Sequence, residues 1–418
     1  MAHELLLFCI CFLFLFHGST AQDFPSQGDD HQVCRFLKLK PLQLNPNLIS
    51  VASEAGETAM WDPLDEQLRC IDAVLIRKVI SPQGLSLPSY VATNELSYVV
   101  QGTGILGAIG SGCPETREKL NIGDFMALPT GTIKWIYNDG LEPLIIISFR
   151  QGSKRQQHSL GGTSRLPNSI NDQLLQSYAA NNVFAGFAKE TLENIYKVDK
   201  EIVTKMQGRQ GDSRGETVHV LDPSTMERHK EEQRQQISQQ QPSNNVCNIT
   251  FRIKGKDPTN IVTSNEGGTI HDVNGTHYLI LKQLQLSALT GDVYSNTLSG
   301  PVFNANAYII ICAIRGSGRV QIVGDSPTPA HDGQLREGEI ILVPQGFATT
   351  TLTGKDGFKW VVFKTNSDPT LISFSGTTSV IQALSTGVLM NMYRINKDQV
   401  QDLKYNRNES GLYPPSRA

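Results

Sequence analysis

The stretch from Gly123 to Asn138 reads GDFMALPTGTIKWIYN. An apolar run follows the acidic second residue, a Pro-x-Gly turn interrupts it, and a second apolar run containing Lys134 resumes after the turn. Short apolar runs separated by Pro and Gly are typical of antiparallel strands joined by tight turns. This stretch therefore predicts a β-corner, with a lysine where a more reactive side chain would be expected.

The same pattern occurs a second time in the chain. Gly338 to Phe347 reads GEIILVPQGF, so the Gly-x5-Pro-x-Gly spacing returns 215 residues later. The sequence Gly102-Thr-Gly104 likewise returns as Gly316-Ser-Gly318. Regular recurrence of this kind indicates a duplicated structural unit. Because each copy contains several short strands at close spacing, we predict an antiparallel sandwich or barrel that is present twice.

A helical tail is predicted after the strands of each copy. Tyr196 to Glu201 matches Tyr393 to Asp398, and Asp199 and Asn396 are good helix N-caps that precede an acidic residue in the first turn. Apolar residues follow at helical spacing in both copies: Ile202, Val203 and Met206 in the first, Val400 and Leu403 in the second. The fold class is therefore mainly β, with two tandem jelly-roll barrels, each followed by a small helical tail.

The N-terminal segment predicts a secretory signal peptide. Residues 5–16 (LLLFCICFLFLF) form an apolar run that is too short to span a bilayer, and Ser19-x-Ala21 suits signal peptidase, although no Lys or Arg precedes the run. We expect residues 1–21 to be the signal peptide, 22–225 the N-terminal barrel and tail, 226–245 an exposed polar linker, and 246–418 the C-terminal barrel and tail. The formal net charge of -3 points to neither nucleic acid nor an anionic membrane as a partner.

Five cysteines remain after the predicted signal peptide is removed: Cys34, Cys70, Cys113, Cys247 and Cys312. Cys312 lies within the apolar run AYIIICAI, so we interpret it as buried and unpaired. The other four have the right number for two disulfide bonds in a secreted protein. Their spacing alone allows three pairings.

The repeated stretch resembles the second half of the motif of cupin barrels. Metal-binding cupins resemble G-x5-P-x-G-x2-H-x3-N, and the first copy has Gly123, Pro129, Gly131 and Asn138, but Lys134 stands in the histidine place. Thr349 stands there in the second copy. Residues 35–157 contain no histidine, so the first barrel lacks the imidazole ligands that Mn, Fe or Zn sites use. We therefore expect no metal and no cofactor.

Lys134 and Glu95 have two interpretations. A buried lysine beside a carboxylate can act as a base or nucleophile, but a structural ion pair is the favoured interpretation. The remaining histidines, including His219, His271 and His331, are interpreted as loop residues. Three N-x-S/T sequons make Asn248, Asn274 and Asn408 candidate glycosylation sites.

Over nearly the whole mature chain, the sequence resembles the legumin-type (11S) seed storage globulins. The resemblance rests on VCRF, QLRC, GCPET, WIYNDG, PVFNANA and LVPQGFA, which occur between residues 33 and 348. It implies a bicupin made as one precursor, a Cys34 to Cys70 bridge, and a Cys113 to Cys247 bridge across a processing site. The family is cut after Asn in Asn-Gly, whereas here Asn244 and Asn245 precede Val246, which makes Asn245 the preferred site for an asparagine-specific protease.

The resemblance implies a non-enzymatic reservoir of nitrogen and amino acids. Such a protein passes through the endoplasmic reticulum to the protein storage vacuole, and it assembles with itself or with related globulins as a trimer and, after cleavage, a hexamer. We expect the apolar face of each helical tail to pack against a neighbouring subunit. Two alternatives are a secreted metal-cupin enzyme and a module that binds a small anion or sugar near Tyr90, Glu95 and Lys134.

Overall fold

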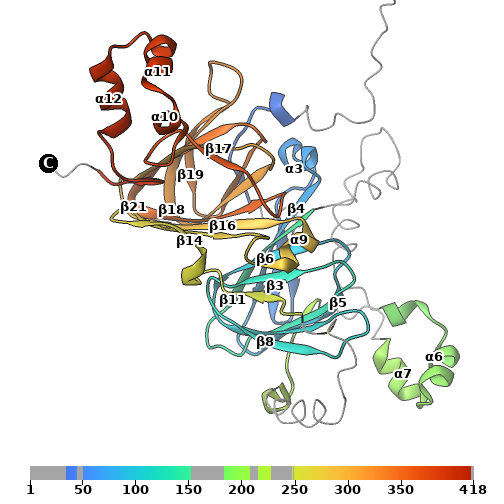
Figure 1. Cartoon of the computed structure of the whole chain (residues 1–418). Coiled ribbons are helices and arrows are strands. Elements are labelled where there is room, and N and C mark those ends of the chain that lie inside the picture. The colour runs from blue at the N-terminus through green and yellow to red at the C-terminus, as the bar shows by residue number, and fades with distance from the viewer. Residues whose placement is uncertain are drawn as a thin grey trace, which may run out of the picture.

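The computed structural model describes residues 34–44, 50–151, 183–207, 215–226, 247 and 249–415. Two β-barrels pack against each other, and helical tails project at opposite ends of the molecule (Figure 1). This arrangement confirms the predicted duplication of a mainly β unit. The predicted signal peptide lies outside the described residues. Within them, no helix combines the length and apolar character that a membrane span requires.

The first barrel consists of two antiparallel sheets that face each other. The seven-stranded sheet has the order β13 (Arg252–Ile253), β9 (Phe125–Leu128), β6 (Glu95–Gln101), β11 (Leu144–Gln151), β4 (Ala73–Ile80), β3 (Gly56–Met60) and β2 (Ser50–Ser53). The five-stranded sheet has the order β12 (Thr217–His219), β5 (Gly84–Tyr90), β10 (Ile133–Tyr137), β7 (Gly104–Ile109) and β8 (Thr116–Leu120).

The second barrel is one continuous eleven-stranded sheet. Its main path is β1 (Leu42–Gln43), β20 (Glu339–Val343), β18 (Ile309–Val323), β21 (Ala348–Lys364), β16 (Ser287–Val293), β15 (Gly268–Val273) and β14 (Ile261–Asn265). Off this path lie β17 (Leu298–Asn304), β19 (His331–Arg336), β22 (Leu371–Ser373) and β23 (Leu412–Tyr413). The long strands β18 and β21 pair along both halves of the barrel, and their register shifts beside Gly316 let the sheet bend there.

The quoted stretch forms the same corner in both barrels. Gly123 and Gly131 have φ of 89° and 87°, and their counterparts Gly338 and Gly346 have φ of 81° and 80°. Only glycine adopts these values without strain, which explains why the two copies share glycine at these positions. The turn after β9 thus carries the chain from one sheet to the other and places Lys134 on β10.

The described helices are short. They are η1 (Cys34–Phe36), α3 (Glu66–Cys70), η3 (Val183–Gly186), α6 (Lys189–Tyr196), α7 (Lys200–Met206), η5 (Pro258–Asn260), α9 (Leu279–Leu284), α10 (Val380–Ala383), α11 (Thr386–Tyr393) and α12 (Lys397–Tyr405). Asp199 and Asn396 occupy the N-cap positions of α7 and α12, as predicted. Asn396 forms a full capping box, whereas Asp199 makes no capping hydrogen bond through its side chain.

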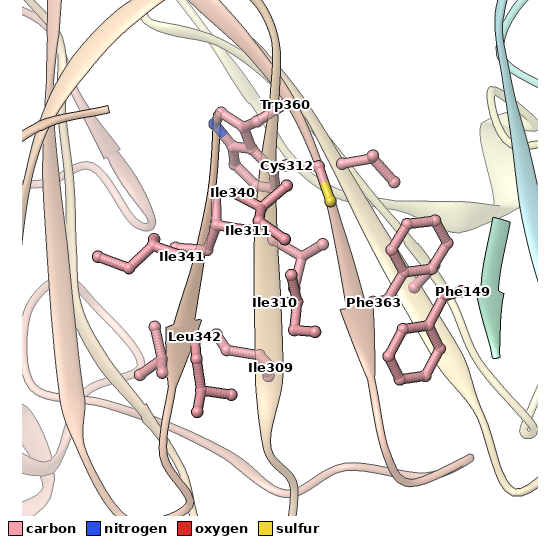
Figure 2. Close-up of a cluster of buried hydrophobic side chains, with 14 of the residues drawn as sticks. Phe149, Ile309, Ile310, Ile311, Cys312, Ile340, Ile341, Leu342, Trp360 and Phe363 are labelled. Atoms are coloured by element: carbon pink, nitrogen blue, oxygen red, sulfur yellow. The ribbon is translucent and has the colours of Figure 1, made fainter. Parts of the chain in front are cut away.

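The two barrels share a hydrophobic core. One face of the seven-stranded sheet packs against β18, β20 and β21 of the second barrel, and the stacked rings of Phe149 and Phe363 lie 5.5 Å apart at this contact (Figure 2). The opposite face of the same sheet lines the interior of the first barrel with Val99, Met126 and Leu128. Burial on both faces explains why its strands are almost continuously apolar.

Each barrel also takes a strand from the other half of the chain. β1 pairs with β20 of the second barrel, and β13 pairs with β9 of the first. Phe251, just before β13, is part of the core inside the first barrel. The two halves are therefore interlocked as well as stacked.

Candidate functional site

Lys134 lies in the interior of the first barrel. Its Nζ makes an ion pair with Oε1 of Glu95, which begins β6 in the opposite sheet. Glu95 is fully buried, and Lys134 is only 9% exposed. The ion pair therefore joins the two sheets across the barrel interior.

Both oxygens of Glu95 are engaged. Arg150 lies directly opposite Glu95 in the pairing of β11 with β6, and its Nε donates to Oε2 at 2.8 Å. Ser97 donates to Oε1 at 2.7 Å, and the hydroxyls of Ser97 and Ser148 lie 2.7 Å apart. Sequence reasoning missed Arg150, Ser97 and Ser148. The available signal was that each is a polar residue within an otherwise apolar strand.

Burial and the neighbouring charges together set the pKa values of Glu95 and Lys134. Burial by itself would raise the pKa of Glu95, but the charge of Arg150, then the charge and hydrogen bond of Lys134, outweigh it and hold the pKa well below its ordinary value. Burial lowers the pKa of Lys134 to about 8, although the neighbouring Glu95 carboxylate opposes that shift. Both groups are therefore charged at neutral pH.

A second ion pair, also missed from the sequence, lies in the same interior. Nζ of Lys78 is 2.9 Å from Oε2 of Glu216, and it donates to the hydroxyl of Ser86 at 3.1 Å. Glu216 also accepts a hydrogen bond from Thr58 at 3.3 Å. Glu216 reaches this position because β12 adds to the edge of the five-stranded sheet beside β5. One sign in the sequence indicates that Lys78 has an acidic partner: it is a lysine within the apolar strand β4 (Ala73–Ile80).

The corresponding place in the second barrel is neutral. Thr349 lies on β21 and is 9% exposed, and its buried Oγ1 has no hydrogen-bond partner among the described residues. The buried Oδ1 of Asn304, on the neighbouring strand β17, also lacks one among them. Farther along β21, Thr353 accepts from the backbone N–H of Thr297 at 2.9 Å and donates to the carbonyl of Tyr294 at 2.5 Å.

The donor set does not fit the metal site of the cupin barrel. A protonated lysine has no free electron pair to offer, and the Glu95 carboxylate is already neutralised by two cations. A threonine hydroxyl alone is a poor substitute for imidazole. Among the described residues, no group of three or more His, Cys, Asp and Glu is placed to hold a metal ion.

Two disulfide bonds join the four cysteines that the resemblance paired. Cys34 is bonded to Cys70 with a Cα–Cα distance of 5.5 Å, and Cys113 is bonded to Cys247 with a Cα–Cα distance of 5.4 Å. Cys312 is a free, buried cysteine, as expected from its apolar neighbours, and burial raises the pKa of its thiol well above the ordinary range. The Cys113–Cys247 bond spans the polar linker in the sequence.

The other candidate residues differ in how far the structure describes them. Asn244, Asn245 and Asn248 lie outside the described residues. The amide of Asn274 donates to Asp272 Oδ2 at 2.7 Å, and its oxygen accepts from the backbone N–H of Thr276. Asn408 is exposed in the segment that follows α12.

The interpretation of the histidines as loop residues was wrong for three of them. His271 lies within β15, His219 ends β12 and His331 begins β19. Polar flanking residues suggested loops, but these strands expose part of one face to solvent, so polar residues are compatible with pairing. His277 lies in a turn before α9, as expected.

Comparison with known proteins gives consistent results along the chain. The family model described as Cupin matches residues 42–201 and 253–401. An 11S globulin seed storage protein of Anacardium occidentale is 30% identical, with 96% of this chain and 97% of the relative covered. Glutelin type-B 2 of Oryza sativa subsp. japonica is also 30% identical, with 97% of this chain and 93% of the relative covered.

Solved structures give the same result. The crystal structure of the coconut allergen cocosin matches with a TM-score of 0.76 at 31% sequence identity, covering 91% of this chain and 100% of that chain. Procruciferin, an 11S globulin from Brassica napus, matches with a TM-score of 0.76 at 28% identity, covering 92% and 99%. With two barrels, two interlocking strands and both disulfides in place, the chain belongs to the cupin family and, within it, to the 11S seed storage globulins.

Proposed function

We propose that this protein is a non-enzymatic reserve of nitrogen and amino acids in the seed. Its relatives include an 11S globulin seed storage protein and the glutelins. The observation that carries the proposal is the buried ion pair between Lys134 and Glu95, which places a structural contact where catalytic cupins hold a metal ligand. The neutral, threonine-lined place in the second barrel supports the same conclusion.

Elemental analysis of protein purified from its natural source tests the absence of an enzymatic metal centre. We expect no stoichiometric Mn, Fe or Zn, because neither Lys134 nor Thr349 is a suitable ligand. The control is a metal-binding cupin carried through the same purification. One bound metal ion per chain would contradict the proposal and revive the enzymatic alternative.

The proposal includes a route through the secretory pathway to the storage vacuole. Residues 1–21 would be removed, residues 22–225 and 246–418 would form the two halves, and residues 226–245 would be the exposed linker. The apolar run at residues 5–16 supports this organisation. Mass spectrometry of the purified N-terminal peptide checks it, since the mature chain should begin near Gln22.

The linker would be cut after Asn245 by an asparagine-specific protease. The Cys113–Cys247 bond then holds the two chains together, because it connects residues on either side of the cut. Intact mass spectrometry should show one species without reductant and two with it, and a Cys247→Ser variant should separate without reductant. A single uncut chain under both conditions would exclude this processing. Peptide mapping of the same sample tests glycosylation, for which the exposed Asn408 is favoured over Asn274.

Self-assembly as a trimer would follow from the two helical tails. They project at opposite ends of the molecule (Figure 1), as a head-to-tail ring requires. Both tails expose apolar side chains that a neighbour would cover: Ile195, Tyr196 and Ile202 in the first, Val388, Met392, Tyr393, Leu403 and Tyr405 in the second. Hexamers, with itself or related globulins, would form after cleavage.

Light scattering coupled to size-exclusion chromatography tests this assembly. The unmodified protein should elute as a trimer or hexamer, and Met392→Asp with Leu403→Asp should yield monomers, because two charges would enter an apolar contact. Leu141→Asp is the control, since Leu141 is 97% exposed but lies between β10 and β11 of the first barrel, outside both tails. A monomer at micromolar concentration in the unmodified protein would contradict the proposal.

A further inference from the structure

A cleft lies beside the contact between the two barrels. Its volume is about 390 Å³, which falls within the range of about 300–1,000 Å³ that is typical of small-molecule sites. The floor comes from one face of β14, β15, β16 and β21, and Tyr98 of β6 contributes from the first barrel. The cleft is separate from the barrel interiors that contain Lys134 and Thr349.

The strand register gathers polar side chains on the floor of the cleft. Thr269, Asp292 and Lys359 are directly opposite one another on three adjacent strands, so their side chains share one face of the sheet. His271 and Thr290 form the next opposed pair on that face. The row is therefore fixed by backbone pairing rather than by loops.

Two lysines and one carboxylate line the cleft without a direct ion pair between them. Among the described residues, neither Lys256 nor Lys359 has an ion-pair partner within 4.0 Å, and Asp292 has none either. Burial, and next the charge of Lys256, lower the pKa of Lys359 and also that of His271. The lining therefore carries two cations against one carboxylate, and the two cations repel each other until an anion enters.

Both ends of the cleft are held in place by close packing. The stem of Lys256 lies over Gly123, about 3.6 Å from where a β-carbon would stand, which is an ordinary packing distance. Gly291 leaves space for the ring of Trp360 on the strand beside it. Lys256 thus approaches the cleft from a segment that is fixed against the first barrel.

Tyr98 contributes a further polar group to the cleft. Its side chain is only 1% exposed, and its hydroxyl makes no hydrogen bond with another described residue. This hydroxyl is not among the fully buried unpaired groups, so it is accessible, and an occupant of the cleft would bond to it. Tyr98 remains a donor at physiological pH, because burial, Asp292 and Asp124 raise its pKa to about 12.

We propose that this cleft binds a small hydroxylated phosphate ester of the sugar-phosphate class. The phosphate group would lie between Lys256 and Lys359, whose ammonium groups match its charge. The hydroxyl groups of the ligand would contact Thr290 and the hydroxyl of Tyr98. This inference is independent of the proposed storage function, and either can fail without the other.

Isothermal titration of the full chain with glucose 6-phosphate tests the proposal. We expect saturable binding at one site, weaker binding of inorganic phosphate, and no binding of glucose. Lys359→Gln and Lys256→Gln should each weaken binding about tenfold, the effect of one lost charge-assisted hydrogen bond. The matched control is Lys355→Gln, which removes the same charge from an exposed position on β21 outside the cleft and should leave the affinity unchanged.

Three results would overturn the proposal. They are a failure of glucose 6-phosphate to saturate, equal weakening by Lys355→Gln, and equal affinity for inorganic phosphate, which would leave the hydroxyl contacts without support. Asp292→Asn is a further test, which does not depend on the folding of the lysine variants. It removes a negative charge from the cleft, so it should tighten phosphate-ester binding, and unchanged or weaker binding would contradict the assigned site.

Discussion

The interiors of the two barrels contrast sharply although they derive from one repeated unit. In the first, Glu95 stands opposite Arg150 and pairs with Lys134. In the second, the corresponding register places Ile309 opposite Lys364, and Thr349 occupies the lysine place. Lys364 turns instead to Asp272 on β15, with its Nζ 2.9 Å from Oδ1. The first barrel thus joins its two sheets by charge, whereas the interior of the second is mainly apolar at the corresponding places.

The neighbouring positions show the same difference. The hydrogen-bonded hydroxyls of Ser97 and Ser148 face each other in the first barrel, and Ile311 and Val362 are paired in the second. Substitution of a complete polar network by apolar residues preserves a fold, whereas loss of one member leaves an unpaired charge. The contrast teaches that a cation kept after loss of the Glu95 carboxylate needs another partner, as Lys364 has in Asp272.

The largest expected effect comes from Glu95→Gln. It leaves Lys134 and Arg150 buried without their carboxylate, so the free energy of unfolding should fall by about 3–5 kcal/mol, as for other broken buried ion pairs. Urea unfolding followed by circular dichroism measures the loss. Glu54→Gln, in the turn between β2 and β3, is the exposed control and should have little effect. A loss as small as that of the control would show that the cluster contributes nothing to stability.

A smaller loss of stability is expected when Glu95 and Lys134 are both replaced by the residues at the corresponding places of the second barrel. Glu95→Ile with Lys134→Thr removes both members of the pair, so the double variant should regain about 1–3 kcal/mol relative to the sum of the single variants. A double-mutant cycle by urea unfolding measures the coupling between the two sites. Strict additivity would mean that the ion pair is energetically unimportant.

The stability of the protein at acid pH should depend on the carboxylate of Glu95. A carboxyl whose folded-state pKa is depressed contributes stability above its unfolded value, here 4.5, and this contribution is lost as the pH falls toward the lower folded value. Below pH 4.5 the stability of the unmodified protein should therefore decrease with an added slope of up to about 1.4 kcal/mol per pH unit. Unfolding measured from pH 6 to pH 2 should show a shallower acid slope in Glu95→Gln. Identical slopes would argue against the assigned ion pair.

The smallest effect is expected in the second barrel. Thr349→Val removes a buried hydroxyl that lacks a partner in the described part of the chain, so stability should be unchanged or increase by up to about 1 kcal/mol. Thr353→Val is the matched control on the same strand. It breaks two hydrogen bonds and should cost about 1–3 kcal/mol. Thermal unfolding distinguishes the two variants, and an equal loss in both would indicate a hidden partner for Thr349.

The sequence predicted the repeated parts of the fold well. The Gly-x5-Pro-x-Gly spacing predicted both corners. A turn that needs positive φ favours glycine regardless of the rest of the chain, so it can be recognised from the sequence alone. The N-caps Asp199 and Asn396 were also local signals and were predicted correctly. The free Cys312 followed from its apolar neighbours. These features depend on residues that are adjacent in the chain.

The candidate sites were predicted only in part. The Lys134–Glu95 pair was recognised through the family motif, but Arg150, Ser97 and Glu216 were not, since their roles depend on strand register and on the late addition of β12. His271 was misinterpreted for the same reason, because its polar neighbours gave no sign of its pairing with Thr290. The cleft that contains it joins segments from both halves of the chain.

Local chemistry in the sequence was sufficient to establish the duplication, the β-corners, the capped helical tails and the lack of histidine between residues 35 and 157. Those properties follow from backbone sterics and composition, which act over a few residues. The packing of one barrel on the other, the exchange of β1 and β13, and the convergence of charges at Glu95 and in the cleft depended on the folded arrangement. Contacts between residues far apart in the chain arise from burial of apolar surface, and burial favours one register among many that the local pattern allows.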